Sequence, residues 1–168
     1  DALAKGVVVE KTGKDGKVTH MVNRDCVGRD CSVILEKIGL HVGPEIRCAI
    51  AEVPFEHTFV QTELMMPILG IVRVKDIDQA IDFAVKAEHG NRHTAHMHSK
   101  NIDNLSRFAT AIETTIFVKN APSYAGIGFG GEGHTTFTIA GPTGEGITSA
   151  RSYTRLRRCV MADHFRII

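Results

Sequence analysis

The feature that most constrains this fold is a regular alternation of strand-like and helix-like segments in the middle of the chain. Residues 68–74 (ILGIVRV) form a nearly continuous apolar run, which is typical of a strand buried on both faces. The segments that follow are a helix at 77–85, a strand at 94–99, a helix at 102–112 and a strand at 115–119. Because their links are short, this order predicts an α/β fold with a mostly parallel sheet and right-handed crossover helices.

Residues with strong positional preferences mark the ends of the expected helices. Asp76 and Asn101 precede the two helical segments, and each is a good N-cap because its side-chain oxygen can accept a hydrogen bond from the first turn. Gly90 follows the first of these helices, where a left-handed residue commonly ends a helix. The boundaries therefore support the alternation.

The first 60 residues predict a less regular arrangement. We expect a short strand at 7–10, an exposed turn at 11–17 (KTGKDGK), an amphipathic helix at 27–38 and a strand at 46–53. Apolar residues recur along one face of that helix, and Gly39 follows it. We place the core of the fold between about residues 46 and 120.

Composition limits the classes of function. The chain has 168 residues, 43% of them hydrophobic, which is ordinary for a folded globular domain. Its formal net charge of +1 does not suggest a nucleic-acid-binding or polybasic membrane protein. The four cysteines form no C-x-x-C pair, so we expect free thiols in a reducing compartment.

A glycine-rich stretch covers residues 121–146. Gly126, Gly128 and Gly131 fit the G-x-G-x-x-G pattern of dinucleotide-binding folds. In those folds a helix follows the motif, and the N-terminus of that helix binds the pyrophosphate. Here the β-like residues 135–140 (TTFTIA) follow instead, so we do not interpret the motif as a dinucleotide site.

Three groups of side chains are candidates for chemistry. His96 and His98 share one face of an expected strand and form a possible metal pair, but no third ligand is evident, and a cluster of packed histidines is the favoured alternative. Cys26 lies near two arginines and is the best nucleophile among the cysteines, although we favour structural thiols for all four. Glu63 lies between a β-segment and a strand, where it could hold a ligand or be a solvated carboxylate.

Several motifs, in this order, resemble one enzyme group. They are residues 63–67 (ELMMP), 88–99 (EHGNRHTAHMHS), 115–123 (TIFVKNAPS), 130–146 (GGEGHTTFTIAGPTGEG) and 148–160 (TSARSYTRLRRCV). The pattern resembles CoA-acylating aldehyde dehydrogenases, in particular the propionaldehyde and acetaldehyde dehydrogenases of bacterial microcompartments. The resemblance covers most of the chain and places it in the aldehyde dehydrogenase superfamily.

The resemblance implies an activity and a domain organisation. It implies that a cysteine thiolate adds to a short aliphatic aldehyde, that hydride passes to NAD, and that coenzyme A takes up the acyl group as cosubstrate. It also implies that the nucleophilic cysteine lies upstream of Asp1, because none of the four cysteines here has the nucleophile's sequence context. Residues 1–147 would then be part of the catalytic domain, and residues 148–168 a C-terminal oligomerisation strand.

The resemblance also implies roles for particular residues. Glu63 matches the glutamate that hydrogen-bonds the nicotinamide ribose, and Met65 stands where hydrolytic relatives have an aromatic residue. Residues matching the aldehyde tunnel are Asn120, Pro122, Ser123, Thr138, Ile139, Ala140 and Gly141. His93 lies in a stretch typical of the subgroup, and we assign it no role. No metal site is implied.

The expected surroundings follow from the same resemblance. It implies a homo-oligomer in the cytoplasm, in the lumen of a bacterial microcompartment, with aldehyde and CoA as small-molecule partners and a shell or other cargo protein as a further one. We expect no nucleic-acid or membrane partner. The alternative is a non-catalytic binding or interaction module built from the same half-domain.

Overall fold

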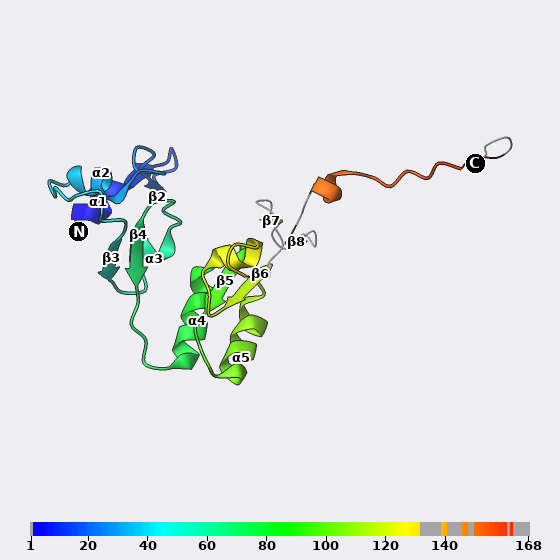
Figure 1. Ribbon diagram of the computed structural model, residues 1–168. Coiled ribbons are helices and arrows are strands. Elements are labelled where there is room, and N and C mark those ends of the chain that lie inside the picture. Colours follow the sequence, from blue (N-terminus) through cyan, green and yellow to red (C-terminus); the bar gives the residue numbers. More distant parts are fainter. Residues whose placement is uncertain (1, 132–138, 141–145, 148–149, 161, 163–168) are drawn as a thin grey trace. The chain divides into compact units, whose positions relative to one another are not determined.

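The computed structural model describes residues 2–131, 139–140, 146–147, 150–160 and 162 (Figure 1). Its contacts divide the chain into two compact units, Asp1–Phe83 and Ala84–Ile168. The described strands form four two-stranded sheets, two of them parallel and two antiparallel. Both parallel pairs have a helix between their strands in the sequence, which confirms the α/β prediction.

The first unit begins with a helix and a hairpin. Helix α1 (Ala2–Val7), which the sequence analysis did not anticipate, leads directly into β1 (Val8–Thr12). That strand pairs antiparallel with β2 (Val18–Val22). Between them the amide of Gly13 donates to the carbonyl of Lys17 at 2.8 Å, so the expected turn is confirmed.

A parallel pair follows the hairpin. Strand β3 (Ala49–Glu52) aligns with β4 (Ile68–Ile71), and the one-turn helix α3 (Thr58–Gln61) connects them. Helix α2 (Cys31–Glu36) is shorter than the expected 27–38, because turns occupy residues 24–28. The core cluster of this unit is Val7, Val8, Cys26, Ile34, Leu64 and Ile68.

The expectation that residues 68–74 are buried on both faces is wrong. Ile68 is buried in the core cluster, whereas Leu69 is 53% and Ile71 43% exposed. The reason is the alternation of side chains along a strand, which sends Ile68 and Leu69 to opposite faces. Only the face that bears Ile68 packs on the core, so the apolar run does not make a strand buried on both sides.

Helix α4 (Ile77–Ala87) spans the boundary between the units and confirms the expected helix at 77–85. The Oδ1 atom of Asp76 accepts a hydrogen bond from the amide of Gln79 at 2.8 Å, as an N-cap does. Gly90 follows the helix with φ +77°, a left-handed conformation that glycine adopts without strain.

The second unit contains the other parallel pair. Strands β5 (Thr94–Met97) and β6 (Ile116–Lys119) flank helix α5 (Ile102–Ile112) in the sequence. Asn101 caps α5, since its Oδ1 atom accepts from the amide of Asn104 at 3.0 Å. The ring of Phe108 packs edge-on against the ring of Phe117 with centroids 5.5 Å apart, which fixes α5 on the pair.

Short elements complete the described chain. They are the 3-10 helix η1 (Ser123–Ile127), the antiparallel strands β7 (Ile139–Ala140) and β8 (Gly146–Ile147), and the 3-10 helix η2 (Ala150–Tyr153). Residues 154–160, which lie in the expected oligomerisation strand, are neither helix nor strand and are exposed. Within the described residues, no helix combines the length and apolarity needed to cross a bilayer.

Candidate functional site

Glu63 is the predicted cofactor-binding residue, and it lies on the loop that joins α3 to β4. Its side chain is exposed, while the side chain of the next residue, Leu64, is only 6% exposed and belongs to the core cluster. Among the residues that the structure describes, the Glu63 carboxylate has no hydrogen-bond partner. Both of its oxygens are therefore open to accept hydrogen bonds from a ligand that carries hydroxyl groups.

The backbone on the N-terminal side of Glu63 is fixed by α3. The amide of Phe59 donates to Nδ1 of His57 at 3.1 Å, and the side-chain amide of Gln61 donates to the carbonyl of Phe55 at 2.6 Å. The amide of Thr62 closes the turn on the carbonyl of Thr58 at 3.0 Å. The loop thus leaves α3 from a defined point.

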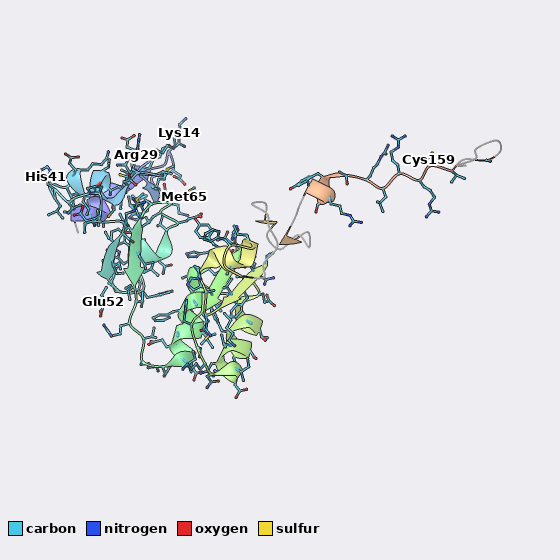
Figure 2. The ribbon with its side chains drawn as sticks, viewed as in Figure 1. Lys14, Arg29, His41, Glu52, Met65 and Cys159 are labelled. Atoms are coloured by element: carbon cyan, nitrogen blue, oxygen red, sulfur yellow. The ribbon has the colours of Figure 1, made fainter. Side chains whose placement is uncertain are left out.

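The backbone on the C-terminal side is fixed by Met65. This residue is left-handed, with φ +54°, and its carbonyl accepts a hydrogen bond from the amide of Gly28 at 3.1 Å. The Met65 side chain is 65% exposed, so it gives little packing (Figure 2). The backbone of Glu63 is thus fixed on both sides, by α3 before it and by the Met65–Gly28 hydrogen bond after it, while its carboxylate is exposed to solvent.

The predicted tunnel residue Asn120 lies directly after β6 and has both ends of its side-chain amide engaged. Its Oδ1 accepts from the amide of Ser99 at 2.7 Å, and its Nδ2 donates to the carbonyl of Ser99 at 2.9 Å. Its own backbone amide donates to the carbonyl of Met97 at 3.0 Å. Asn120 therefore joins the carboxyl ends of β5 and β6, and its two hydrogen bonds to Ser99 hold its side-chain amide in place.

Pro122 and Ser123 open η1 at the same edge. The carbonyl of Pro122 accepts from the amide of Ala125 at 2.9 Å, and Oγ of Ser123 lies 3.2 Å from Nδ1 of His96. The His96 and His98 rings stand edge to face with centroids 5.7 Å apart. The structure thus brings Ser123 to the histidine pair, a link that sequence reasoning missed because 27 residues separate Ser123 from His96.

A cleft of about 530 Å³ lies beside this segment and is lined by β6 and the glycine-rich stretch. Its lining includes Thr115, Phe117, Lys119, Ala121, Gly126 and Gly130. Of the other predicted tunnel residues, Ile139 and Ala140 form β7, and Thr138 and Gly141 lie outside the described residues. The geometry groups Asn120, Pro122 and Ser123 at one edge, in a different unit from Glu63.

The remaining candidates behave as structural groups. Cys26 is fully buried with its Sγ 3.8 Å from the carbonyl oxygen of Gly6, which supports a structural thiol rather than a nucleophile. Burial and the nearby Cys48 raise the pKa of the Cys31 thiol, the opposite of what a nucleophile needs. Nδ1 of His93 lies 2.6 Å from Oγ1 of Thr94. In the described part of the chain, no three His, Cys, Asp or Glu side chains are placed to hold a metal.

Comparison with known proteins shows the family to which the chain belongs. The profile of the aldehyde dehydrogenase family matches residues 27–158. Acetaldehyde dehydrogenase (acetylating) EutE of Salmonella typhimurium is 53% identical over 162 residues, which are 96% of this chain and 34% of that protein. The chain spans about a third of the length of the curated relatives it matches.

Solved structures give the same picture. Rhodopseudomonas palustris propionaldehyde dehydrogenase with bound propionyl-CoA is 53% identical, with a TM-score of 0.83 over 95% of this chain and 34% of that one. An engineered glycolyl-CoA reductase with bound NADP+ has the same identity, TM-score and coverage. Propionaldehyde dehydrogenase from the Clostridium phytofermentans fucose utilisation bacterial microcompartment is 54% identical, with a TM-score of 0.80 over 98% of this chain and 36% of that one.

Proposed function

The chain belongs to the aldehyde dehydrogenase family, and from that premise we propose that it is the C-terminal part of an NAD-dependent, CoA-acylating aldehyde dehydrogenase. Its substrate is a short aliphatic aldehyde, acetaldehyde or propionaldehyde, and its product is the acyl-CoA. The observation that carries the proposal is identity above 50% along nearly the whole chain to acylating enzymes of this type. The nucleophilic cysteine belongs to the part of the enzyme that precedes Asp1.

Glu63 has a positioning role in this reaction. When bound, the nicotinamide accepts hydride from the thiohemiacetal of the cysteine, and the resulting thioester passes its acyl group to CoA. The Glu63 carboxylate accepts hydrogen bonds from the nicotinamide ribose hydroxyls, for which its exposure and open oxygens are suited. A carboxylate with this role holds the ring in place and transfers no proton itself.

The edge formed by Asn120, Pro122 and Ser123 makes one wall of the aldehyde tunnel. Asn120 is fixed by its bonds to Ser99, so this wall is preorganised before substrate enters. Residues 138–141 (TIAG) line the acyl chain in the same proposal, and the small residues among them, Ala140 and Gly141, suit a short aldehyde.

Replacing Glu63 by glutamine in the full-length enzyme tests the cofactor role. Glu63→Gln keeps the size and removes the charge, and we expect slower NADH formation in a single turnover with propionaldehyde. A nicotinamide displaced by about 1 Å can lose on the order of 100-fold in rate. Glu56→Gln, a change at an exposed glutamate of the segment before α3, is the matched control and should leave the rate unchanged. An E63Q enzyme with the wild-type rate contradicts the assignment.

Two observations distinguish the proposal from the alternative, a non-catalytic binding module. We expect the purified 168-residue chain alone to form no NADH from propionaldehyde, CoA and NAD. The sequence immediately upstream of Asp1 in the parent protein decides between the two readings. A cysteine there in an aldehyde dehydrogenase context supports the enzyme, and its absence supports a non-catalytic module.

The C-terminal tail supports a homo-oligomer. Residues 154–160 are exposed, and within them Leu156 is 92% and Val160 80% exposed. A strand that pairs with another subunit would cover these side chains and take its register from their alternation. The nearby arginines, Arg155 and Arg157 among them, would face acidic groups at the rim.

Deleting residues 151–168 from the full-length enzyme should therefore lower its oligomeric state. Light scattering at low protein concentration measures the change, and a truncated enzyme that keeps the full-length assembly contradicts the tail's role.

We also propose that the enzyme resides in a microcompartment lumen, alongside shell or cargo proteins. Copurification of the enzyme with intact shells, and its release when shells are broken, tests that location.

A further inference from the structure

We propose that His57 is a positioning residue for Glu63, which it holds in place by capping α3. The inference deepens the proposed function and rests on the cofactor role of Glu63. His57 precedes α3, with an extended backbone (φ −67°, ψ 144°), and Nδ1 of its ring accepts from the amide of Phe59 at 3.1 Å. Ser, Thr, Asp and Asn usually make this bond, and here an imidazole makes it.

The cap fixes which nitrogen of His57 carries a proton. Because Nδ1 accepts the hydrogen bond, it must be unprotonated, and the proton of the neutral ring is on Nε2. The ring also stands edge-on to the ring of Phe59, with centroids 4.6 Å apart and planes at 74°. His57 thus contacts the first turn of α3 through both its nitrogen and its ring.

A helix as short as α3 depends on such contacts. It spans only four residues, Thr58–Gln61, and a single turn is unfavourable by itself because it fixes several backbone angles for one or two hydrogen bonds. Two further contacts support it. Gln61 bonds the carbonyl of Phe55, and Phe59 packs against the backbone of Gly70 in β4.

The end of α3 sets where the Glu63 carboxylate lies. Thr62 closes the last turn on the carbonyl of Thr58, and Leu64 enters the core immediately after Glu63. Glu63 is the one residue between these two points, so the position of its backbone depends on whether α3 stays helical. If the cap is lost and α3 unwinds, Glu63 moves while Leu64 and the Met65–Gly28 bond still hold the other end.

The test uses the full-length enzyme and four variants: H57A, H57N, E63Q and the H57A/E63Q double variant. We expect H57A to slow single-turnover NADH formation by on the order of tenfold. This is less than the roughly 100-fold that a displacement of about 1 Å can cost, because Gln61 and Phe59 still hold α3. Asparagine is a strong N-cap, so H57N should restore the rate to within about twofold of wild type.

The double variant distinguishes positioning from general stability. If His57 acts only through Glu63, H57A should slow the E63Q enzyme no further, whereas a separate structural defect adds its own factor. Hydrogen exchange of residues 58–64 supplies a readout independent of activity, and we expect faster exchange in H57A and recovery in H57N.

Each result decides one part of the inference. A wild-type rate in H57A together with a slow E63Q enzyme overturns the positioning role and leaves Glu63 as proposed. Additive effects in the double variant, or unchanged hydrogen exchange in H57A, also overturn it. A wild-type rate in E63Q overturns the cofactor role of Glu63 and the inference that rests on it.

Discussion

Gly70→Ala is a direct perturbation of the contact between α3 and β4. A Cβ atom at Gly70 would lie 3.0 Å from Cβ of Phe59 and 3.2 Å from both the carbonyl carbon and oxygen of Phe59. Ordinary carbon contacts are about 3.5–4.0 Å, so the methyl group intrudes by roughly half an ångström. Two of the three atoms belong to the backbone of α3, which cannot rotate away as a side-chain end can.

The expected cost follows from these distances. Overpacking a tight contact costs about 1–3 kcal/mol, and replacing glycine by alanine returns about 0.4–1 kcal/mol by restricting the unfolded chain. The net loss therefore lies between about 0 and 2.6 kcal/mol, and is about 1.3 kcal/mol at the midpoints of the two ranges. For a chain of this length, the midpoint loss lowers Tm by roughly 3–5 °C.

Thermal and urea unfolding of G70A and wild type measure the change. Gly6→Ala is the matched control, since its added methyl meets only the Cγ2 atom of Ile38, at 3.2 Å, and a side-chain end can shift. Gly6 also lies in α1, where alanine has the better helix propensity, so G6A should be neutral or stabilising. A G70A chain more stable than wild type, as restriction of the unfolded chain alone would make it, would refute the packing of α3 on β4. The same result would weaken the argument that α3 fixes Glu63.

Three further expectations follow from individual contacts. Asn101→Ala removes the cap of α5 and should cost about 1 kcal/mol in urea unfolding, whereas N101D should retain most of it. The bidentate bond to Arg73 lowers the pKa of Glu52 in the folded chain. The ion pair therefore adds a small amount to the free energy of unfolding at pH values above the ordinary glutamate pKa of about 4.3. That contribution is lost as the pH falls through the lower pKa of the folded state. Unfolding free energies of wild type and E52Q against pH at low salt should differ in that acid range, and coincident slopes would contradict it. Native thiol labelling should modify exposed Cys48 rapidly and buried Cys26 only after denaturation, and rapid labelling of Cys26 would show that the first unit is not packed as described.

The elements that the sequence predicted best are the helices that begin with a capping hydrogen bond between residues close together in the sequence. Asp76 and Asn101 were expected as caps, and both accept the expected hydrogen bonds. These interactions join residues three positions apart, so sequence spacing alone determines them. The strand at 68–74 was expected to be longer and buried on both faces, because an apolar run does not reveal how many layers cover the strand.

The contacts missing from the sequence analysis join distant residues or unusual partners. Ser123 meets His96 only because β5 and β6 lie side by side, and no local pattern signals that meeting. His57 was overlooked as a cap, because histidine ranks low among N-cap residues and α3 is too short to show helical periodicity. The positive φ of Met65 was equally hidden, since a non-glycine residue in that conformation is uncommon.

The two candidate site regions differ in their place relative to the strands. Asn120 and Ser123 were identified by the family resemblance, and they follow the carboxyl end of a parallel strand, where ligands of α/β folds usually bind. Glu63 lies instead before the amino end of β4, where its loop position allowed either a ligand-holding or a solvated carboxylate, and the family resemblance selected the cofactor role. At that end no strand terminus fixes the carboxylate. Its position depends on the His57 cap before it and on the Met65–Gly28 bond after it. The residues that fix the position of Glu63 are therefore ones that shape the backbone. Under the proposed function, substitutions there should alter hydride transfer without touching any ligand.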